Sequence, residues 1–341
     1  GDVLLPHPAQ SGRGQFPSLH GVDIHRALKA AGTILLCLTG TLASAQQIAQ
    51  YTQYVFNHFS VNPAVAGSKD CMDIRLGYRQ QWVGFEGAPT TAWASLHATI
   101  KAKNKPYQAN KHGVGVFVEA DDTGPLGYTH FYLAYAYHMQ VARGYFVSAG
   151  LFGGLKQLKL DQGQVTLANY DDPAIADAAG SSLVYPEISP GIWAYSNNFW
   201  VGIAGSGLLN NRVDDIGIET RATSRHFSLS GGYRMKVGRN TAFTPSTLIK
   251  LSPGSPVAFD LNAMLDWKRR YGLGVSYRNQ DAIAFMGKVS FLKYFSLGYS
   301  YDITTSRLRV SSSNTHEVVL AITPCTPVDP SKRIVSCPIF E

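Results

Sequence analysis

The feature that most constrains the fold is an alternation of apolar and polar side chains with a period of two residues, which recurs along the chain after residue 71. In the stretch 72–82, every second residue except Gln80 is apolar or aromatic, and the residues between are mostly charged or polar. Successive side chains of a β-strand point to opposite faces, so this stretch has one apolar and one charged face. The same pattern recurs at 130–140, 226–236, 259–268 and 295–302. The sequence therefore predicts a chain of two-faced strands.

The number and length of these strands indicate a membrane barrel. No window after residue 45 approaches 18 consecutive apolar residues, so no helical membrane span is predicted. Most expected strands are close to the ~9–11 residues that a tilted strand needs to cross a bilayer, and aromatic residues gather near their ends. The fourteen expected strands are 72–84, 91–102, 112–121, 127–141, 144–158, 188–196, 198–206, 224–236, 244–251, 257–267, 271–278, 281–291, 295–303 and 316–323.

The lengths of the connections give an independent indication. Even connections are mostly short, whereas the odd ones include the long segments 159–187, 207–223 and 304–315. Bacterial outer-membrane barrels combine short periplasmic turns with long external loops, and an even strand count returns both termini to one side. We therefore predict an all-β fold: a transmembrane antiparallel β-barrel of about 14 strands in the outer membrane, with both termini periplasmic. A soluble all-β protein is the alternative, but it would not separate long from short connections.

The N-terminal part has the pattern of an export signal. A basic patch is followed by an apolar run at 30–38 and a small-x-small pattern ending at Ala45. The first 22 residues lack an initiator Met and are expected to be vector or upstream translated sequence. We expect residues 1–45 to be a leader and signal peptide that is removed. A periplasmic N-terminal segment at 46–70, the barrel at 71–323 and a periplasmic C-terminal tail at 324–341 should follow.

Charge and cysteine content narrow the function classes. The chain has 30 basic and 23 acidic residues, and its basic clusters, 101–105 and 268–270, are too short and scattered for nucleic-acid binding. Three cysteines, Cys71, Cys325 and Cys337, follow the signal peptide. Export permits a disulfide, either Cys325 with Cys337 or Cys71 with Cys325, and the alternative is that all three stay reduced. No pair has the Cys-x-x-Cys spacing of a zinc site.

Catalytic motifs are missing from the sequence. It contains no Gly-x-x-x-x-Gly-Lys-Ser/Thr, His-Glu-x-x-His or Gly-x-Ser-x-Gly pattern, so we expect no cofactor, no metal and no enzyme. His130 and His138 share one strand face, but they are ~26 Å apart at the usual strand rise and cannot share a metal. A membrane-embedded hydrolase that uses Ser148 and His138 on adjacent strands is a minor alternative.

Three motifs near the first strand carry a family resemblance. Residues 53–57 (QYVFN), 62–68 (NPAVAGS) and 78–91 (YRQQWVGFEGAPTT) closely resemble the N-terminal signature of the PorP/SprF family, outer-membrane proteins of the Bacteroidetes type IX secretion system. Residues 58–61 depart from the family, which commonly has a Pro and more apolar residues there. The resemblance implies a barrel of the secretion or gliding apparatus that binds a periplasmic peptidoglycan-associated lipoprotein and, in some members, the C-terminal domain of a secreted adhesin. A passive porin or small-solute channel is the alternative.

The motif residues also have a physical interpretation. Asn62-Pro63 is a turn signal, and Gly67 permits a left-handed backbone, so residues 57–68 should form a compact turn before the first strand. Arg79 and Gln81 should face the lumen, Trp82 the outer aromatic girdle, and residues 84–89 the outside. These residues either bind partners or only close the barrel and fix its first hairpin. The full set of motif residues is Asn57, Asn62, Pro63, Gly67, Arg79, Gln81, Trp82, Gly84, Phe85, Gly87, Ala88, Pro89 and Thr91.

Overall fold

A computed structural model describes residues 51–69, 71–100, 110–161, 182–209, 225–279, 281–292, 294–306 and 314–324. The expected leader at 1–45, nearly all of the C-terminal tail and most of the long connections lie outside these ranges. In the described ranges, no helix has the length and apolar character needed to cross a membrane.

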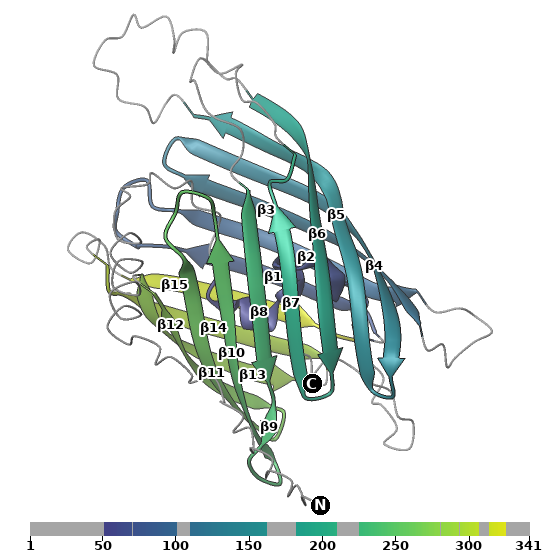
Figure 1. The fold of residues 1–341 in the computed structure, drawn as a ribbon. Coiled ribbons are helices and arrows are strands. Elements are labelled where there is room, and N and C mark those ends of the chain that lie inside the picture. Colours follow the sequence, from purple (N-terminus) through teal and green to yellow (C-terminus); the bar gives the residue numbers. More distant parts are fainter. Residues whose placement is uncertain are drawn as a thin grey trace, which may run out of the picture. The chain divides into compact units, whose positions relative to one another are not determined.

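The described residues are mostly β-strands, in the order drawn in Figure 1. The strands are β1 (Asp73–Gln80), β2 (Thr90–Ile100), β3 (Lys111–Thr123), β4 (Leu126–Ala142), β5 (Tyr145–Leu160), β6 (Ser182–Ser196), β7 (Phe199–Ser206), β8 (His226–Tyr233), β9 (Met235–Lys236), β10 (Thr241–Leu251), β11 (Ala258–Trp267), β12 (Tyr271–Arg278), β13 (Ala282–Phe291), β14 (Phe295–Thr304) and β15 (Thr315–Ile322).

These strands form one closed antiparallel barrel. Neighbours in the sequence pair with each other, and β15 pairs with β1 to close the sheet. The short β9 continues β8 after a break at Arg234, because both pair with β10. Counted as one, they leave fourteen strands, which confirms the predicted fold class. Antiparallel pairing all around satisfies the backbone hydrogen-bonding groups without an open edge, as a bilayer requires.

Two strand limits differ from the prediction by four residues or more. β1 ends at Gln80 instead of 84, because Trp82 turns the chain with a φ of 47° and the Gln81 amide bonds to the Pro89 carbonyl at 2.9 Å. β6 begins at Ser182 instead of 188. Pro186 and Pro190 interrupt the sequence signal there, but in the barrel both are exposed and the strand pairs with β5 along its whole length.

The two faces of the wall follow the period-two pattern. On β1, Leu76 and Tyr78 are exposed on the outside, whereas Asp73, Arg75 and Arg79 are buried inside. The same division extends around the described strands, with exposed aromatic and aliphatic side chains outside. An apolar outer surface on a closed barrel suits contact with lipid.

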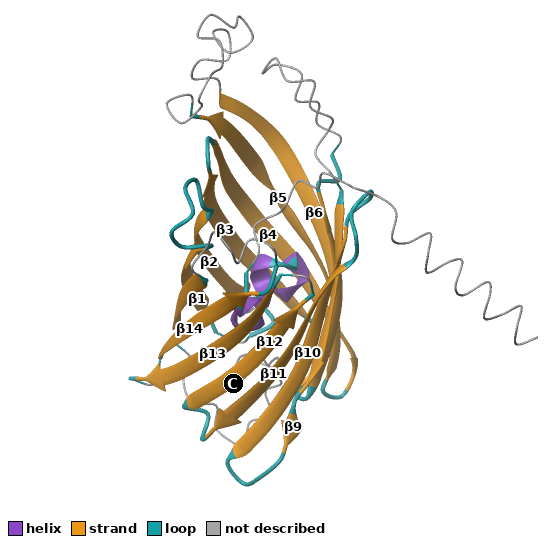
Figure 2. Ribbon diagram, turned by 90° about the vertical axis from the view of Figure 1, so that its left-hand side faces the viewer, coloured by secondary structure: helices purple, strands orange, loops and turns teal. Residues whose placement is uncertain are grey.

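The interior of the barrel is occupied by the chain itself. Residues 51–69, here called the plug, form three short 3-10 helices, η1 (Gln53–Phe56), η2 (His58–Ser60) and η3 (Pro63–Val65). Figure 2 shows them inside the ring of strands. The prediction of a periplasmic segment before the barrel is therefore wrong for residues 51–69. Their polar backbone groups and apolar side chains find partners on strands that only a closed barrel brings together.

Candidate functional site

The first anchor of the plug is a buried charged network next to η1. The Arg79 guanidinium donates to Thr52 Oγ1 at 2.7 Å, Glu317 Oε2 at 2.9 Å and Asp302 Oδ2 at 3.1 Å. The Thr52 amide donates to Glu317 Oε2 at 2.8 Å, and Arg278 reaches Thr52 Oγ1 at 2.9 Å. Arg79, Asp302 and Glu317 are each at most 1% exposed. Buried carboxylates need such partners. The network therefore links β1 to β14 and β15, where the barrel closes, and fixes the start of the plug.

The second anchor is the turn at η3. Asn62 Oδ1 accepts a hydrogen bond from the Ala64 amide at 2.9 Å, which caps η3. The Asn62 Nδ2 group donates outward to the carbonyls of Ile192 at 3.0 Å and Ile203 at 3.2 Å. Asn62 thus uses both ends of its amide, one to shape the plug and the other to hold β6 and β7.

Wall side chains from β2, β4 and β5 complete this anchor. Ser148 Oγ donates to the Ala64 carbonyl at 2.8 Å, and His138 Nε2 lies 2.6 Å from the Ala66 carbonyl. Thr99 Oγ1 donates to the Gly67 carbonyl at 2.7 Å. His138 and Ser148 are direct register partners on β4 and β5, so the two residues of the hydrolase alternative do come together. Each is occupied by the plug, which does not favour a hydrolase.

Glycines let the plug approach the wall this closely. Gly67 has a φ of 73°, and a Cβ there would lie 2.4 Å from Gly113 Cα. A Cβ at Gly113 would lie 1.9 Å from the Ala66 carbonyl oxygen, and one at Gly150 would lie 2.5 Å from Ala64. Contacts this short are forbidden, so the sequences of plug and wall are matched.

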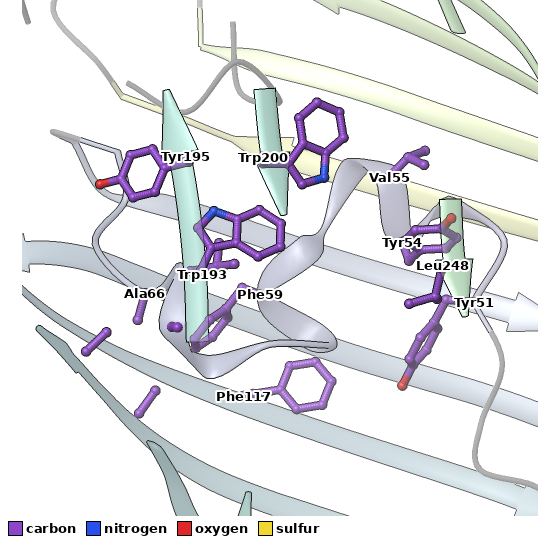
Figure 3. Packing of buried hydrophobic residues seen from close by; sticks show 14 of the residues in the cluster. Tyr51, Tyr54, Val55, Phe59, Ala66, Phe117, Trp193, Tyr195, Trp200 and Leu248 are labelled. Carbon is purple, nitrogen blue, oxygen red and sulfur yellow. The ribbon is translucent and has the colours of Figure 1, made fainter. Parts of the chain in front are cut away.

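Between the anchors, the plug buries an apolar cluster, shown in Figure 3. Phe59 is fully buried against Phe152, with ring centroids 5.1 Å apart. The His58 ring packs between Trp193 and Trp200, with ring centroids 5.5 Å from each, and neither ring nitrogen has a hydrogen-bond partner in the part of the chain that the structure describes. Burial, with a smaller contribution from Arg75, lowers the pKa of His58 to about 3. His58 is therefore neutral and acts as an aromatic packing residue.

A cavity of about 480 Å³ lies beside the plug, at the end of the barrel where the odd connections leave the strands. Plug side chains contribute to its lining along with wall residues from several strands. The wall contributes aromatic rings and charged groups of both signs. The lining includes Tyr51, Tyr54, Pro63, Gln81, Trp82, Phe117, Glu119, His130, Tyr132, Phe152, Lys156 and Glu187.

The structure places the motif residues in two groups. Asn57, Asn62, Pro63 and Gly67 lie in the plug, where Asn57 donates to Ser95 Oγ at 3.1 Å. Arg79 lies on β1 and donates to Thr52 of the plug. These five face the inside and contact the chain itself. The remaining motif residues lie where β1 ends and β2 begins.

Gln81 and Trp82 line the cavity. The prediction that Trp82 faces the outer girdle is wrong, because the positive φ of Trp82 ends the alternation one residue earlier.

The loop after Trp82 is a separate exposed feature. Gly84 and Gly87 have φ values of 90° and 71°, and the Ala88 amide bonds to the Phe85 carbonyl at 3.2 Å. Gly84, Phe85 and Gly87 are exposed, and Pro89 holds the base of the loop through the Gln81 amide. Thr91 Oγ1 donates to Asp121 at 2.5 Å on the neighbouring strand. The loop is accessible to a partner in a way that the plug residues are not.

The remaining groups considered from the sequence are the cysteines and the two histidines of β4, for which no metal site is expected. Cys71 is disulfide-bonded, and its one expected partner, Cys325, lies outside the described residues, as does Cys337. His130 lies 3.4 Å from Glu119, whereas His138 contacts the Ala66 carbonyl of the plug. The two histidines therefore have different partners. In the part of the chain that the structure describes, no group of three or more His, Cys, Asp or Glu could hold a metal ion.

Sequence reasoning missed the wall partners of the plug. Asp302 on β14 and Glu317 on the adjacent β15 lie far along the chain from the plug, and the sequence suggests a role for Ser148 and His138 only in the minor hydrolase alternative. The available signal was that charged residues recur on the inner face of β1, β14 and β15. That pattern shows an interior that needs polar partners, but not where the partners come from.

Comparison with known proteins gives one family and several distant barrels. A family model described as type IX secretion system membrane protein PorP/SprF matches residues 43–322. The chain is also similar to the toluene transporter TbuX of Ralstonia pickettii, with 10% identity, a TM-score of 0.45, and coverage of 79% of this chain and 92% of that chain. A Pseudomonas aeruginosa FadL homologue has 10% identity and a TM-score of 0.44, with coverage of 83% of this chain and 95% of that chain. A mutant of the TodX monoaromatic hydrocarbon channel has 11% identity and a TM-score of 0.47, with coverage of 81% of this chain and 94% of that chain. No curated protein matches the chain.

Proposed function

Because the chain belongs to the PorP/SprF family of type IX secretion system membrane proteins, we propose that it acts by binding protein partners of that system at the outer membrane. The proposed partners are a periplasmic peptidoglycan-associated lipoprotein and the C-terminal domain of a secreted adhesin. In this proposal the barrel is a fixed membrane platform, and it carries out no chemical reaction.

The observation that carries the proposal is the plug. It reaches from the Arg79 network on one side of the lumen to β4, β5 and β6 on the other, and its anchors are buried hydrogen bonds. A segment of the chain across the lumen reduces the open cross-section through which solutes could diffuse freely. A platform gains rigidity, because every anchored strand is held in one register.

The partner surfaces proposed are the two rims. At one rim, the loop 84–89 is exposed and connected to the wall by the Gln81 and Thr91 bonds. The other rim carries the short turns, where the described residues are rich in Arg and Lys. We assign the short-turn rim and both termini to the periplasm, on the parity of the connections.

Affinity purification from native membranes, followed by mass spectrometry, tests this function. Recovery of secretion-system proteins with the full-length barrel supports it, and a matched purification of an unrelated outer-membrane barrel sets the background. The passive-channel alternative is tested on the purified barrel in a planar bilayer. Large, stable, ion-selective currents without any partner would replace the binding function with conduction.

A further inference from the structure

The cavity beside the plug contains carboxylates that the described residues leave short of positive charge. Glu119 and Glu187 both line it, and each is at least 94% buried. Glu187 accepts from the Gly207 amide at 3.0 Å and from Ser189 at 3.4 Å, and has no ion pair among the described residues. Glu119 has only His130, at 3.4 Å. Buried carboxylates without a cationic partner are costly, so this arrangement suits a cation supplied from outside.

Strand register brings these groups into two adjacent rows. Glu119, His130 and Lys156 are successive register partners across β3, β4 and β5. One step along the barrel, Phe117, Tyr132, Gly154 and Glu187 form the next row across β3 to β6. Gly154 leaves space for the Tyr132 ring, since a Cβ there would lie 2.7 Å from Tyr132 Cδ1. Tyr132 on β4 and Glu187 on β6 thereby stand on either side of Gly154 on β5.

Aromatic faces surround the carboxylates. Phe117 and Tyr132 are stacked with ring centroids 6.5 Å apart, and Phe152 lies 5.5 Å from Tyr132. All three line the cavity. Aromatic faces attract alkylammonium and guanidinium groups and also cover an aliphatic stem. The combination favours a cation on an apolar chain over a bare metal ion.

A plug residue supplies an independent indication of a missing ligand. Tyr51 is 7% exposed and lines the cavity, and its hydroxyl has no hydrogen-bond partner among the described residues. In Figure 3 the Tyr51 hydroxyl points towards the part of the cluster in which Phe117 lies. A buried hydroxyl without a partner is unfavourable, and a ligand N–H group in the cavity would satisfy it.

The internal cation closest to this role is Lys156, which lines the cavity but makes no ion pair among the described residues. Its Nζ lies over the Tyr128 ring at 5.2 Å instead. The two rows hold one lysine and two buried glutamates, and Lys156 repels an incoming cation while it attracts the same carboxylates. Its removal should therefore strengthen the site.

We propose that the cavity binds one alkylammonium or guanidinium group on an apolar stem, of the kind that a lysine or arginine side chain carries, between Glu119 and Glu187. The proposal deepens the proposed function, on which it rests for the source of the group, a polypeptide partner. Binding of the cationic group by the barrel is tested without any protein partner, so this proposal and the proposed function can fail separately.

The test is calorimetric titration of the purified full-length barrel in detergent. The cationic probes are Nα-acetyl-lysine methylamide and Nα-acetyl-arginine methylamide, and the matched neutral probes are the norleucine and citrulline analogues. n-Butylammonium distinguishes a free amine from a side chain presented by a peptide backbone. We expect the cationic probes to bind at least about tenfold more tightly than their neutral analogues. Equal binding of both kinds, or no binding of the cationic probes, would overturn the proposal.

Variants distinguish binding at Glu119 and Glu187 from a general attraction of cations to negative charge on the barrel. Glu119→Gln and Glu187→Gln should each weaken the cationic probes about tenfold or more, whereas Glu86→Gln, on the exposed loop, should leave them unchanged. Lys156→Met should tighten binding a few-fold, a gain that misfolding cannot produce. Unchanged affinity in both glutamine variants, or loss of binding in Lys156→Met, would rule the site out.

Discussion

At the scale of single residues, the plug depends on positions where no side chain fits. Gly113 on β3 faces the Ala66 carbonyl, and an added Cβ would overlap it at 1.9 Å. The neighbouring atoms are backbone on both sides and cannot rotate away. Gly113 is thus specified by a segment that precedes the barrel in sequence, although nothing around residue 113 indicates it.

Gly113→Ala is expected to destabilise the barrel by about 1–3 kcal/mol, because the plug or β3 must shift to relieve the overlap. Gly153→Ala is the matched control, since a Cβ there meets nothing within 4 Å on β5. Urea unfolding from detergent micelles, followed by tryptophan fluorescence, measures both. Equal midpoints for the two variants would show that the plug does not contact β3 as closely as described.

His58 gives the plug a pH dependence whose sign follows from its burial. Its pKa is about 3 in the folded state against 6.5 ordinarily, so the unfolded chain binds a proton that the folded chain does not between these values. Stability should therefore fall as pH decreases from 6.5 towards 3, by about 1.4 kcal/mol per pH unit from this residue.

His58→Phe keeps the aromatic contacts with Trp193 and Trp200 and removes this contribution. We expect the variant to lose less stability than the wild type between about pH 7 and pH 5, measured by the urea midpoint at each pH. Other histidines contribute equally to both proteins, so only the difference counts. Parallel pH profiles would mean that His58 is solvated or protonated in the folded barrel.

At the scale of elements, the plug is a segment tied at both ends. The Arg79 network holds η1, and Asn62 with Ser148 and His138 holds η3. When one end is released, the other keeps the segment at a high effective concentration near its site. Loss of either anchor alone should leave the lumen filled most of the time.

Arg79→Met and Asn62→Ala test this two-ended attachment by bilayer conductance. Each single variant is expected to open rarely, whereas the double variant should conduct more than about tenfold above either one. Arg143→Met, in the exposed turn between β4 and β5, is the control for a lost arginine. Additive conductance in the double variant would mean that the two anchors act independently.

The strands were predictable and the plug was not, for a physical reason. Alternation is a local property, so β11 and β12 could be read from residues 257–278 almost to the residue. The plug has no such period. Asn62, for example, bonds to carbonyls 130 and 141 residues away, which become neighbours only after β6 and β7 pair. The motifs marked the segment as special, while its location depended on partners scattered over the sequence.

At the scale of the whole molecule, the two rims differ in charge. The turns after β4, β9 and β11 carry exposed Arg143, Arg239 and the run 268–270, whereas the opposite rim carries exposed acidic residues such as Glu86 and Asp122. With fourteen strands, the start of β1 and the end of β15 lie on the same rim as the short turns. The proposed orientation, which rests on the parity of the connections, puts this basic rim in the periplasm.

Single-cysteine labelling tests that orientation. Glu86→Cys on the loop after β1 should react with a membrane-impermeant maleimide in intact cells. Arg143→Cys, on the turn between β4 and β5, should react only after the outer membrane is permeabilised, because the two residues lie at opposite rims and the reagent does not cross the bilayer. The wild type, whose Cys71 is disulfide-bonded, sets the background from the native cysteines. Labelling of position 143 but not 86 in intact cells would invert the barrel. The cavity would then face the periplasm and the basic rim would face the outside, the reverse of the proposed orientation.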